Sequence, residues 1–116
     1  MTNYRLYLKN ISEAMVAAQA FVSGIGFDAF VADDKTASAV LQKLKIVGEA
    51  AKKVPETIRQ DHPQIPWEQM TRMRDRIIHA YFAVDYVVVW DTLKVDIPQL
   101  QPIIRQILED LEKESV

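Results

Sequence analysis

The sequence predicts an all-α protein, an antiparallel bundle of four to five helices. Apolar residues recur at steps of three and four along most of the chain, which is the spacing of one helix face. The segments between these runs are short and hold the glycines and prolines that end helices. One run, residues 86–90 (YVVVW), favours a strand by composition, but no other segment offers it a partner strand, so we assign it to a helix.

The first two helices are predicted from their apolar stripes and their end signals. The first covers residues 4–22 and ends at the SGIG segment, residues 23–26, because glycine tolerates the left-handed backbone common at helix ends. After one short turn, Asp33 or Asp34 caps the second helix, and Pro55 breaks it.

The second half of the chain predicts two more helices. A proline-rich connector with about one helical turn leads to a third long helix over residues 67–93. Asp96 then caps the last helix, with Pro98 at the first helical position and Gln99 placed to close the cap. Within the second helix, Gly48 is expected to let two helices approach closely.

Composition limits the classes of function. A chain of 116 residues with 49% hydrophobic residues is expected to form one globular domain over residues 1–116, and dimerisation would bury more of its surface. No cysteine, no long apolar run and no signal-peptide pattern occur, so we expect a cytoplasmic protein that neither forms disulfides nor crosses a membrane. The net charge of −2 argues against binding nucleic acid through overall basicity.

The candidate site lies in residues 74–86, RDRIIHAYFAVDY. His79 is one of only two histidines, and the chain's only dense basic patch, Arg72, Arg74 and Arg76, precedes it. In one continuous helix, Arg74 and Tyr81 would share a face beside the apolar stripe. Asp75 would lie one turn before His79 and could reach it, whereas Arg74 and His79 would lie about 140° apart.

A second copy of the chain could bring these groups together. Two arginines, two histidines and two tyrosines would then line one groove at a two-fold axis. Arginine offers planar forks for phosphate oxygens, and histidine exchanges protons near neutral pH. RNA carries its own nucleophile, the 2′-hydroxyl. With two distant histidines, no cysteine and no tight acidic cluster, we expect no metal site and no cofactor.

A structural interpretation stays open on the residues alone. A single histidine on a helix is more often packed or exposed than catalytic. Three arginines in five residues usually form a solvated face, and Tyr81 beside a core stripe usually packs with its hydroxyl at the surface. Outside the motif, we expect Trp67 and Trp90 to anchor helix packing.

The combination of motifs resembles the HEPN-domain ribonucleases. Arg74, His79 and Tyr81 match the pattern R-x4-H-x-Y. Residues 46–93 look like the HepT branch of that family, with Gly-Glu-Ala before the connector, Pro-Trp at the start of the third helix and Val-Trp after the tyrosine. The likeness covers essentially the whole chain.

The resemblance implies a homodimeric toxin of a bacterial or archaeal toxin–antitoxin pair that cleaves single-stranded RNA without a metal and leaves a 2′,3′-cyclic phosphate. Its partner would be a small MntA-like nucleotidyltransferase antitoxin, which silences the toxin by transferring AMP from ATP to the motif tyrosine, here Tyr81. The resemblance leaves open whether dimers and antitoxin form a larger assembly.

Roles follow as hypotheses. Arg74 would stabilise the transition-state charge, and His79, oriented by Asp75, would move the proton. Tyr81 would accept AMP and offer a stacking surface, while Arg72 and Arg76 would steer the substrate or simply be solvated. Two other functions stay open: a non-catalytic module that binds nucleotide or RNA beside a nucleotidyltransferase, and a purely structural dimer.

Overall fold

The computed structural model describes residues 4–79 and 83–114 and confirms the all-α class. Two strands of two residues each are the only non-helical elements in that part of the chain. The elements in chain order are α1 (Tyr4–Phe21), α2 (Phe27–Ala32), α3 (Asp34–Lys53), α4 (Glu56–Asp61), α5 (Trp67–Thr71), α6 (Met73–Ile77), β1 (Ile78–His79), β2 (Ala83–Val84), α7 (Tyr86–Asp91), a π-helix η2 (Thr92–Asp96) and α8 (Ile97–Glu114).

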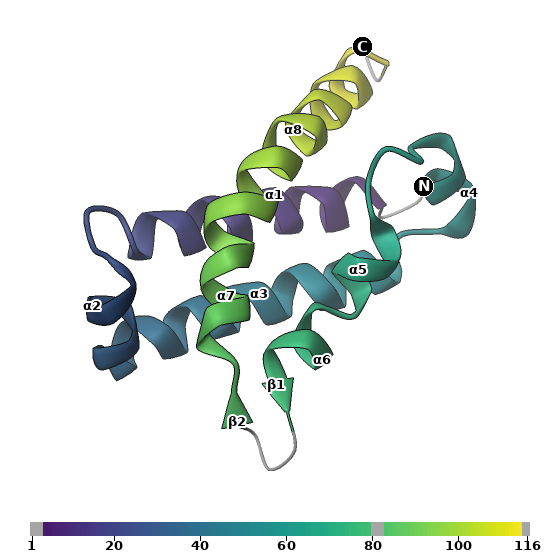
Figure 1. Cartoon of the computed structure of the whole chain (residues 1–116). Coiled ribbons are helices and arrows are strands. Elements are labelled where there is room, and N and C mark those ends of the chain that lie inside the picture. The colour runs from purple at the N-terminus through teal and green to yellow at the C-terminus, as the bar shows by residue number, and fades with distance from the viewer. Residues whose placement is uncertain (1–3, 80–82, 115–116) are drawn as a thin grey trace.

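The base of the fold is the antiparallel pair α1 and α3, which lie side by side (Figure 1). Their facing stripes form much of the core, and both are almost entirely buried. The stripes consist of Leu8, Ile11, Met15 and Ala18 from α1 and Val40, Leu44 and Val47 from α3. Burying each of these leucine, isoleucine, methionine and valine side chains contributes about 1.5–3 kcal/mol, so the other elements pack on a stable helix pair.

Three predicted boundaries around this pair are confirmed. Gly24 ends the turn after α1 with a φ of 79°, a value that favours glycine. Asp33 caps α3, because its carboxylate accepts a hydrogen bond from the Thr36 amide at 3.1 Å. Hydrogen bonding by Thr36 also lowers the pKa of Asp33, since these bonds favour the ionised form. The second helix ends at Lys53, just before Pro55.

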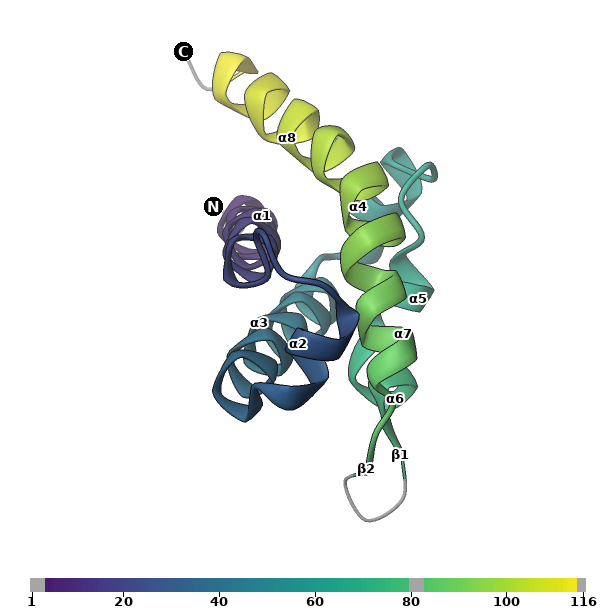
Figure 2. The ribbon, with the colours of Figure 1, turned by 60° about the vertical axis from the view of Figure 1, so that its left-hand side comes forward.

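The third long element is a continuous helical run made of α7, η2 and α8, which crosses the α1–α3 pair at a steep angle (Figure 2). The prediction that Asp96 caps a separate last helix is therefore wrong. Asp91, Thr92 and Ile97 all have helical φ and ψ, and the Ile97 amide donates to the Thr92 carbonyl five residues earlier. Pro98 has no amide hydrogen for the usual bond, and the wider π-turn lies directly before it.

The predicted helix over residues 67–93 is also wrong as a single element. It divides at Arg72, between α5 and α6, and ends at Ile77. There the chain becomes extended and forms an antiparallel ladder in which Ile78 faces Val84 and His79 faces Ala83. The Ile77 carbonyl, which would accept from four residues ahead in a helix, instead accepts a hydrogen bond from the Asp85 amide at 2.8 Å.

Close packing holds the divided segment against α3. A Cβ added to Gly48 would lie 3.3 Å from the Met70 carbonyl oxygen and 3.8 Å from that of Thr71. The prediction that Gly48 lets two helices approach is thus confirmed, and the close approach falls at the break before α6. Among the described residues, no helix combines the length and apolar character that crossing a bilayer requires.

Candidate functional site

The motif begins on α6, a helix of five residues that carries Arg74, Asp75 and Arg76. Met73 and Ile77 are the buried side of this helix, with 2% and 1% of their surfaces exposed. They fix its rotation against the core, because a five-residue helix has little stability of its own. As a result, Arg74 is half-buried beside the apolar stripe, whereas Asp75 and Arg76 are exposed.

The three arginines differ in their partners. Arg72 pairs with Glu68 one turn earlier, with Nη2 2.9 Å from Oε1, and both side chains are largely exposed. Arg76 lies 4.0 Å from Asp96 across the gap between α6 and η2. Arg74 makes no hydrogen bond or ion pair with any other described residue. Of the predicted basic patch, it is the arginine that no described acidic side chain faces.

The change from helix to strand alters the geometry predicted for the histidine. His79 lies on β1, two residues beyond the end of α6, so the separation of about 140° expected for Arg74 and His79 on one helix does not apply. The one-turn geometry expected for Asp75 and His79 is wrong for the same reason. Tyr81, predicted to share a helix face with Arg74, lies outside the described residues.

Asp85 connects the end of the motif segment to α6 and to α7. Its amide donates to the Ile77 carbonyl, which joins the end of β2 to the end of α6. Its carboxylate Oδ1 accepts from the Val88 amide at 3.1 Å and caps α7. Sequence reasoning missed this residue, although an aspartate directly before the YVVVW run is an N-cap signal.

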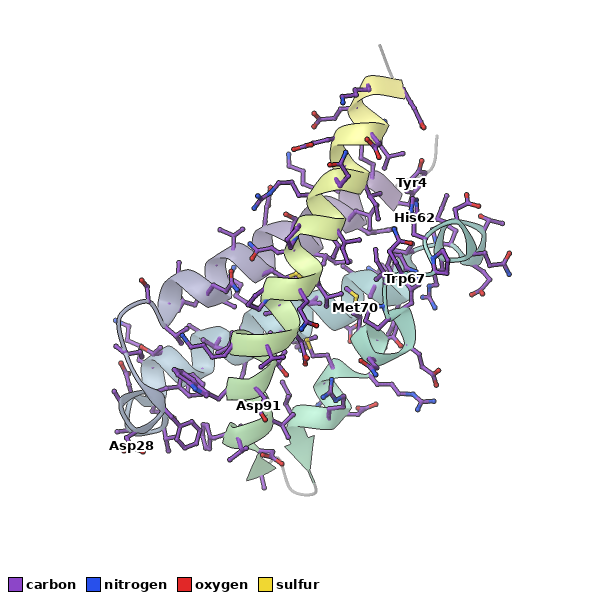
Figure 3. The ribbon with its side chains drawn as sticks, turned by 45° about the horizontal axis from the view of Figure 1, so that its top comes forward. Tyr4, Asp28, His62, Trp67, Met70 and Asp91 are labelled. Carbon is purple, nitrogen blue, oxygen red and sulfur yellow. The ribbon has the colours of Figure 1, made fainter. Side chains whose placement is uncertain are left out.

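The two tryptophans near the motif contribute to the packing of the helices. Trp67 is 8% exposed and donates through Nε1 to the carbonyl of the half-buried His62 at 3.0 Å, and the two residues lie near each other in Figure 3. Trp90 packs on Phe30, with ring centroids 5.3 Å apart. The predicted packing role of both tryptophans is confirmed. Within the described part of the chain, no three histidine, aspartate or glutamate side chains gather as a metal site would require.

Comparison with known proteins identifies what this chain is similar to. The family model described as "Ribonuclease HepT-like" matches residues 11–107. The chain is 46% identical, over 99 residues, to a protein of Thermococcus cleftensis named "Probable ribonuclease HepT", covering 85% of this chain and 90% of that one. It is 38% identical over 111 residues to a protein of Methanocaldococcus jannaschii whose name describes an RNase, covering 96% and 92% of the two chains.

A bacterial relative shows the same likeness. A protein of Caldanaerobacter subterraneus, also named as an RNase, is 37% identical over 115 residues, which cover 99% of this chain and all of that one. No solved structure is significantly similar to this fold.

Proposed function

Because this chain belongs to the ribonuclease HepT-like family, we propose that it is the toxin of a toxin–antitoxin pair, an endoribonuclease that cuts single-stranded RNA without a metal. The observation that carries the proposal is the state of Arg74: half-buried in the first turn of α6, five residues before His79, and without a partner among the described residues. A permanently charged fork held in this way, while its neighbours Arg72 and Arg76 face acids, is suited to a phosphate oxygen.

The reaction needs only groups that the RNA and the motif supply. The 2′-oxygen attacks the adjacent phosphorus, the bond from phosphorus to the 5′-oxygen breaks, and the products are a 2′,3′-cyclic phosphate and a 5′-hydroxyl. One proton leaves the 2′-hydroxyl and one reaches the departing 5′-oxygen. His79 is assigned this transfer, and Arg74 balances the extra negative charge on the phosphorane. An orienting role for Asp75 belongs to the same proposal, but it does not rest on a helical turn shared with His79.

Two proton transfers at opposite sides of one phosphorus suit two histidines better than one. We therefore assign the working form to a homodimer whose Arg74 and His79 pairs line a shared groove. Mixed dimers test this arrangement. A wild-type chain paired with a chain that carries both Arg74→Ala and His79→Ala should keep well under half of the wild-type activity, because the shared groove then holds one arginine and one histidine. Half of the activity in these dimers would assign each site to a single chain.

The test of the activity itself uses single-stranded RNA in EDTA. Wild-type protein should cut, and Arg74→Ala or His79→Ala should each reduce the rate by at least about 100-fold. Arg105→Ala, which removes an exposed arginine of α8, is the matched control and should cut normally. Tight RNA binding with no cleavage at any protein concentration would instead favour the non-catalytic binding module.

Regulation is assigned to Tyr81 and a nucleotidyltransferase antitoxin. AMP on the tyrosine would bring a bulky phosphate into the groove that Arg74 serves and so oppose substrate binding by charge and by volume. Co-expression of this cytoplasmic pair should raise the intact mass of the chain by whole AMP units, and Tyr81→Phe should remove the gain. An unchanged mass in the presence of active transferase would refute this regulation.

A further inference from the structure

A cavity of about 270 Å³ adjoins the motif helix and is not used by the proposed cleavage reaction. It lies between α5 and α6 on one side and η2 and α8 on the other. Met70, Met73, Leu100 and Ile103 supply its apolar surface. Met70 belongs to α5 and lies on the side of that helix that faces the α7–α8 run (Figure 3). The volume is below the roughly 300–1,000 Å³ of clefts that hold drug-sized ligands, so a flat group of about one ring system is the appropriate size.

The polar groups of this cavity are arranged as neighbouring donors and acceptors. Arg76 and Asp96 face each other at 4.0 Å, from α6 and η2, and each side chain is about two-fifths exposed. Gln69 and Gln99 also line the cavity. The separation of 4.0 Å exceeds that of a hydrogen bond, so the two charged groups retain capacity for a ligand.

The charge balance favours a base over a phosphate. Arg76 and Asp96 offset each other, so the cavity lacks the unbalanced positive charge that attracts phosphate groups. Apolar side chains beneath a polar edge suit the face and the edge of an unpaired base. Arg74 and Arg76 are two residues apart on one short helix and point to opposite sides of it, so a base held here and the phosphate that Arg74 contacts would belong to different nucleotides of one strand.

We propose that this cavity binds one unpaired base of the RNA substrate, and that Asp96 makes guanine the preferred base. The proposal rests on the proposed ribonuclease function. Guanine presents two adjacent N–H groups, on N1 and on the 2-amino group, which one carboxylate can accept together. Its O6 accepts from a neighbouring guanidinium, which Arg76 provides. Cytosine, adenine and uracil lack the pair of adjacent donors.

Methionine methyl NMR tests the site without relying on cleavage. Met70 and Met73 line the cavity, whereas Met15 is fully buried in α1 and serves as the internal reference. Millimolar GMP should shift the Met70 and Met73 methyl signals and leave that of Met15 in place, with CMP, AMP and UMP weaker. Absence of shifts with GMP, or shifts that follow protein concentration because a second copy fills the cavity, would overturn the proposal.

Substitution separates Asp96 from its surroundings. Asp96→Asn should weaken GMP binding at least about fivefold, the lower end of what a well-placed pair of hydrogen bonds to a base edge contributes. Asp91→Asn makes the same change at an exposed position of the same helical run that does not line the cavity, and it should bind GMP as the wild type does. Equal binding by both variants would overturn the role of Asp96.

The two proposals fail in different ways. If RNA is cut, wild-type cleavage sites should lie at a constant spacing from guanines, and this dependence on guanine should be lost in Asp96→Asn. Unchanged cut positions in that variant would refute the base site without contradicting the proposed ribonuclease activity. If no RNA is cut but GMP still moves the two methyl signals in a manner that depends on Asp96, the nuclease fails and the base site stands.

Discussion

Gly48 of α3 and Met70 of α5 meet so closely that a Cβ on the glycine would lie 3.3 Å from the methionine carbonyl oxygen. This contact seats the segment that leads into the motif on the most stable helix pair of the fold. The candidate site should therefore be sensitive to the side-chain volume at Gly48, although this residue has no functional group.

Gly48→Ala should leave the free energy of unfolding nearly unchanged. The better helix propensity of alanine, about 0.5–1 kcal/mol, is offset by the tight contact with Met70. Gly48→Val should destabilise the protein by about 1–3 kcal/mol and reduce RNA cleavage, because the break before α6 must move. Urea unfolding measures the change in stability of both variants. Ser38→Val, at an exposed position of α3, is the control and should cost well under half as much.

Arg74→Lys keeps the positive charge but loses the planar fork, so we expect cleavage to fall by about tenfold or more. The fold should be unaffected, because Arg74 holds no described partner. Initial rates on one RNA substrate give the comparison, with Arg105→Lys as the matched control. Full activity in Arg74→Lys would mean that charge alone, and not two-point contact, is what the reaction uses.

Asp85→Ala should lower the stability by about 0.5–2 kcal/mol, because the cap of α7 is lost. Cleavage should fall no further than the loss of stability explains, since the bond that closes β2 onto α6 comes from the backbone amide of residue 85 and is kept in this variant. Asp85→Asn retains a capping oxygen and should restore most of both properties. Thermal unfolding and cleavage rates together decide the matter: identical behaviour of the two variants would argue against the capping role.

Phe30 should be the costliest aromatic residue to truncate. It is fully buried and contacts Trp90 and Tyr86, with ring centroids at 5.3 and 6.0 Å. Phe30→Ala should cost about 3–5 kcal/mol, measured by urea unfolding. Phe21→Ala removes the same side chain where 41% of it is exposed, and about 1 kcal/mol is expected. Similar costs for both would show that the α2–α7 contact is not part of the stable core.

Asp33 should make the start of α3 acid-sensitive. Because the hydrogen bonds from Thr36 lower its pKa below the usual value of 3.8, the ionised carboxylate stabilises the folded chain above that pH. The contribution is lost as the pH falls through the lowered pKa. The stability difference between wild type and Asp33→Ala should thus be constant near neutrality and shrink below about pH 4. A difference that stays constant down to pH 2 would contradict this account.

Sequence patterns predicted the helices whose ends carry local signals. The apolar stripes located α1 and α3, and the glycine, aspartate and proline at their ends fixed their limits because each acts on its own backbone neighbourhood. The helical assignment of the YVVVW run is also confirmed, since Asp85 caps it and Val89 is buried. Its high β-propensity was overridden by packing.

The breaks around the motif could not be predicted in the same way. The apolar rhythm continues from Met70 through Ile77 to Val84, so periodicity alone favours one helix. The chain departs from it because Asp85 bonds to Ile77 and because Gly48 admits the backbone at Met70. Both contacts depend on tertiary arrangement. The pairing of Arg76 with Asp96 has the same origin, as the two residues are twenty positions apart.

The π-helix η2 explains how one helical run serves two sets of neighbours. The buried positions Val89, Leu93 and Ile97 follow one another at two successive steps of four, which would drift by about 80° around an ideal α-helix. Looser winding over residues 92–96 absorbs that drift and lets the stripe continue straight to Leu111. A chain shortened by one residue here would have to give up either the alignment of α8 over α1 or the approach of Asp96 to Arg76.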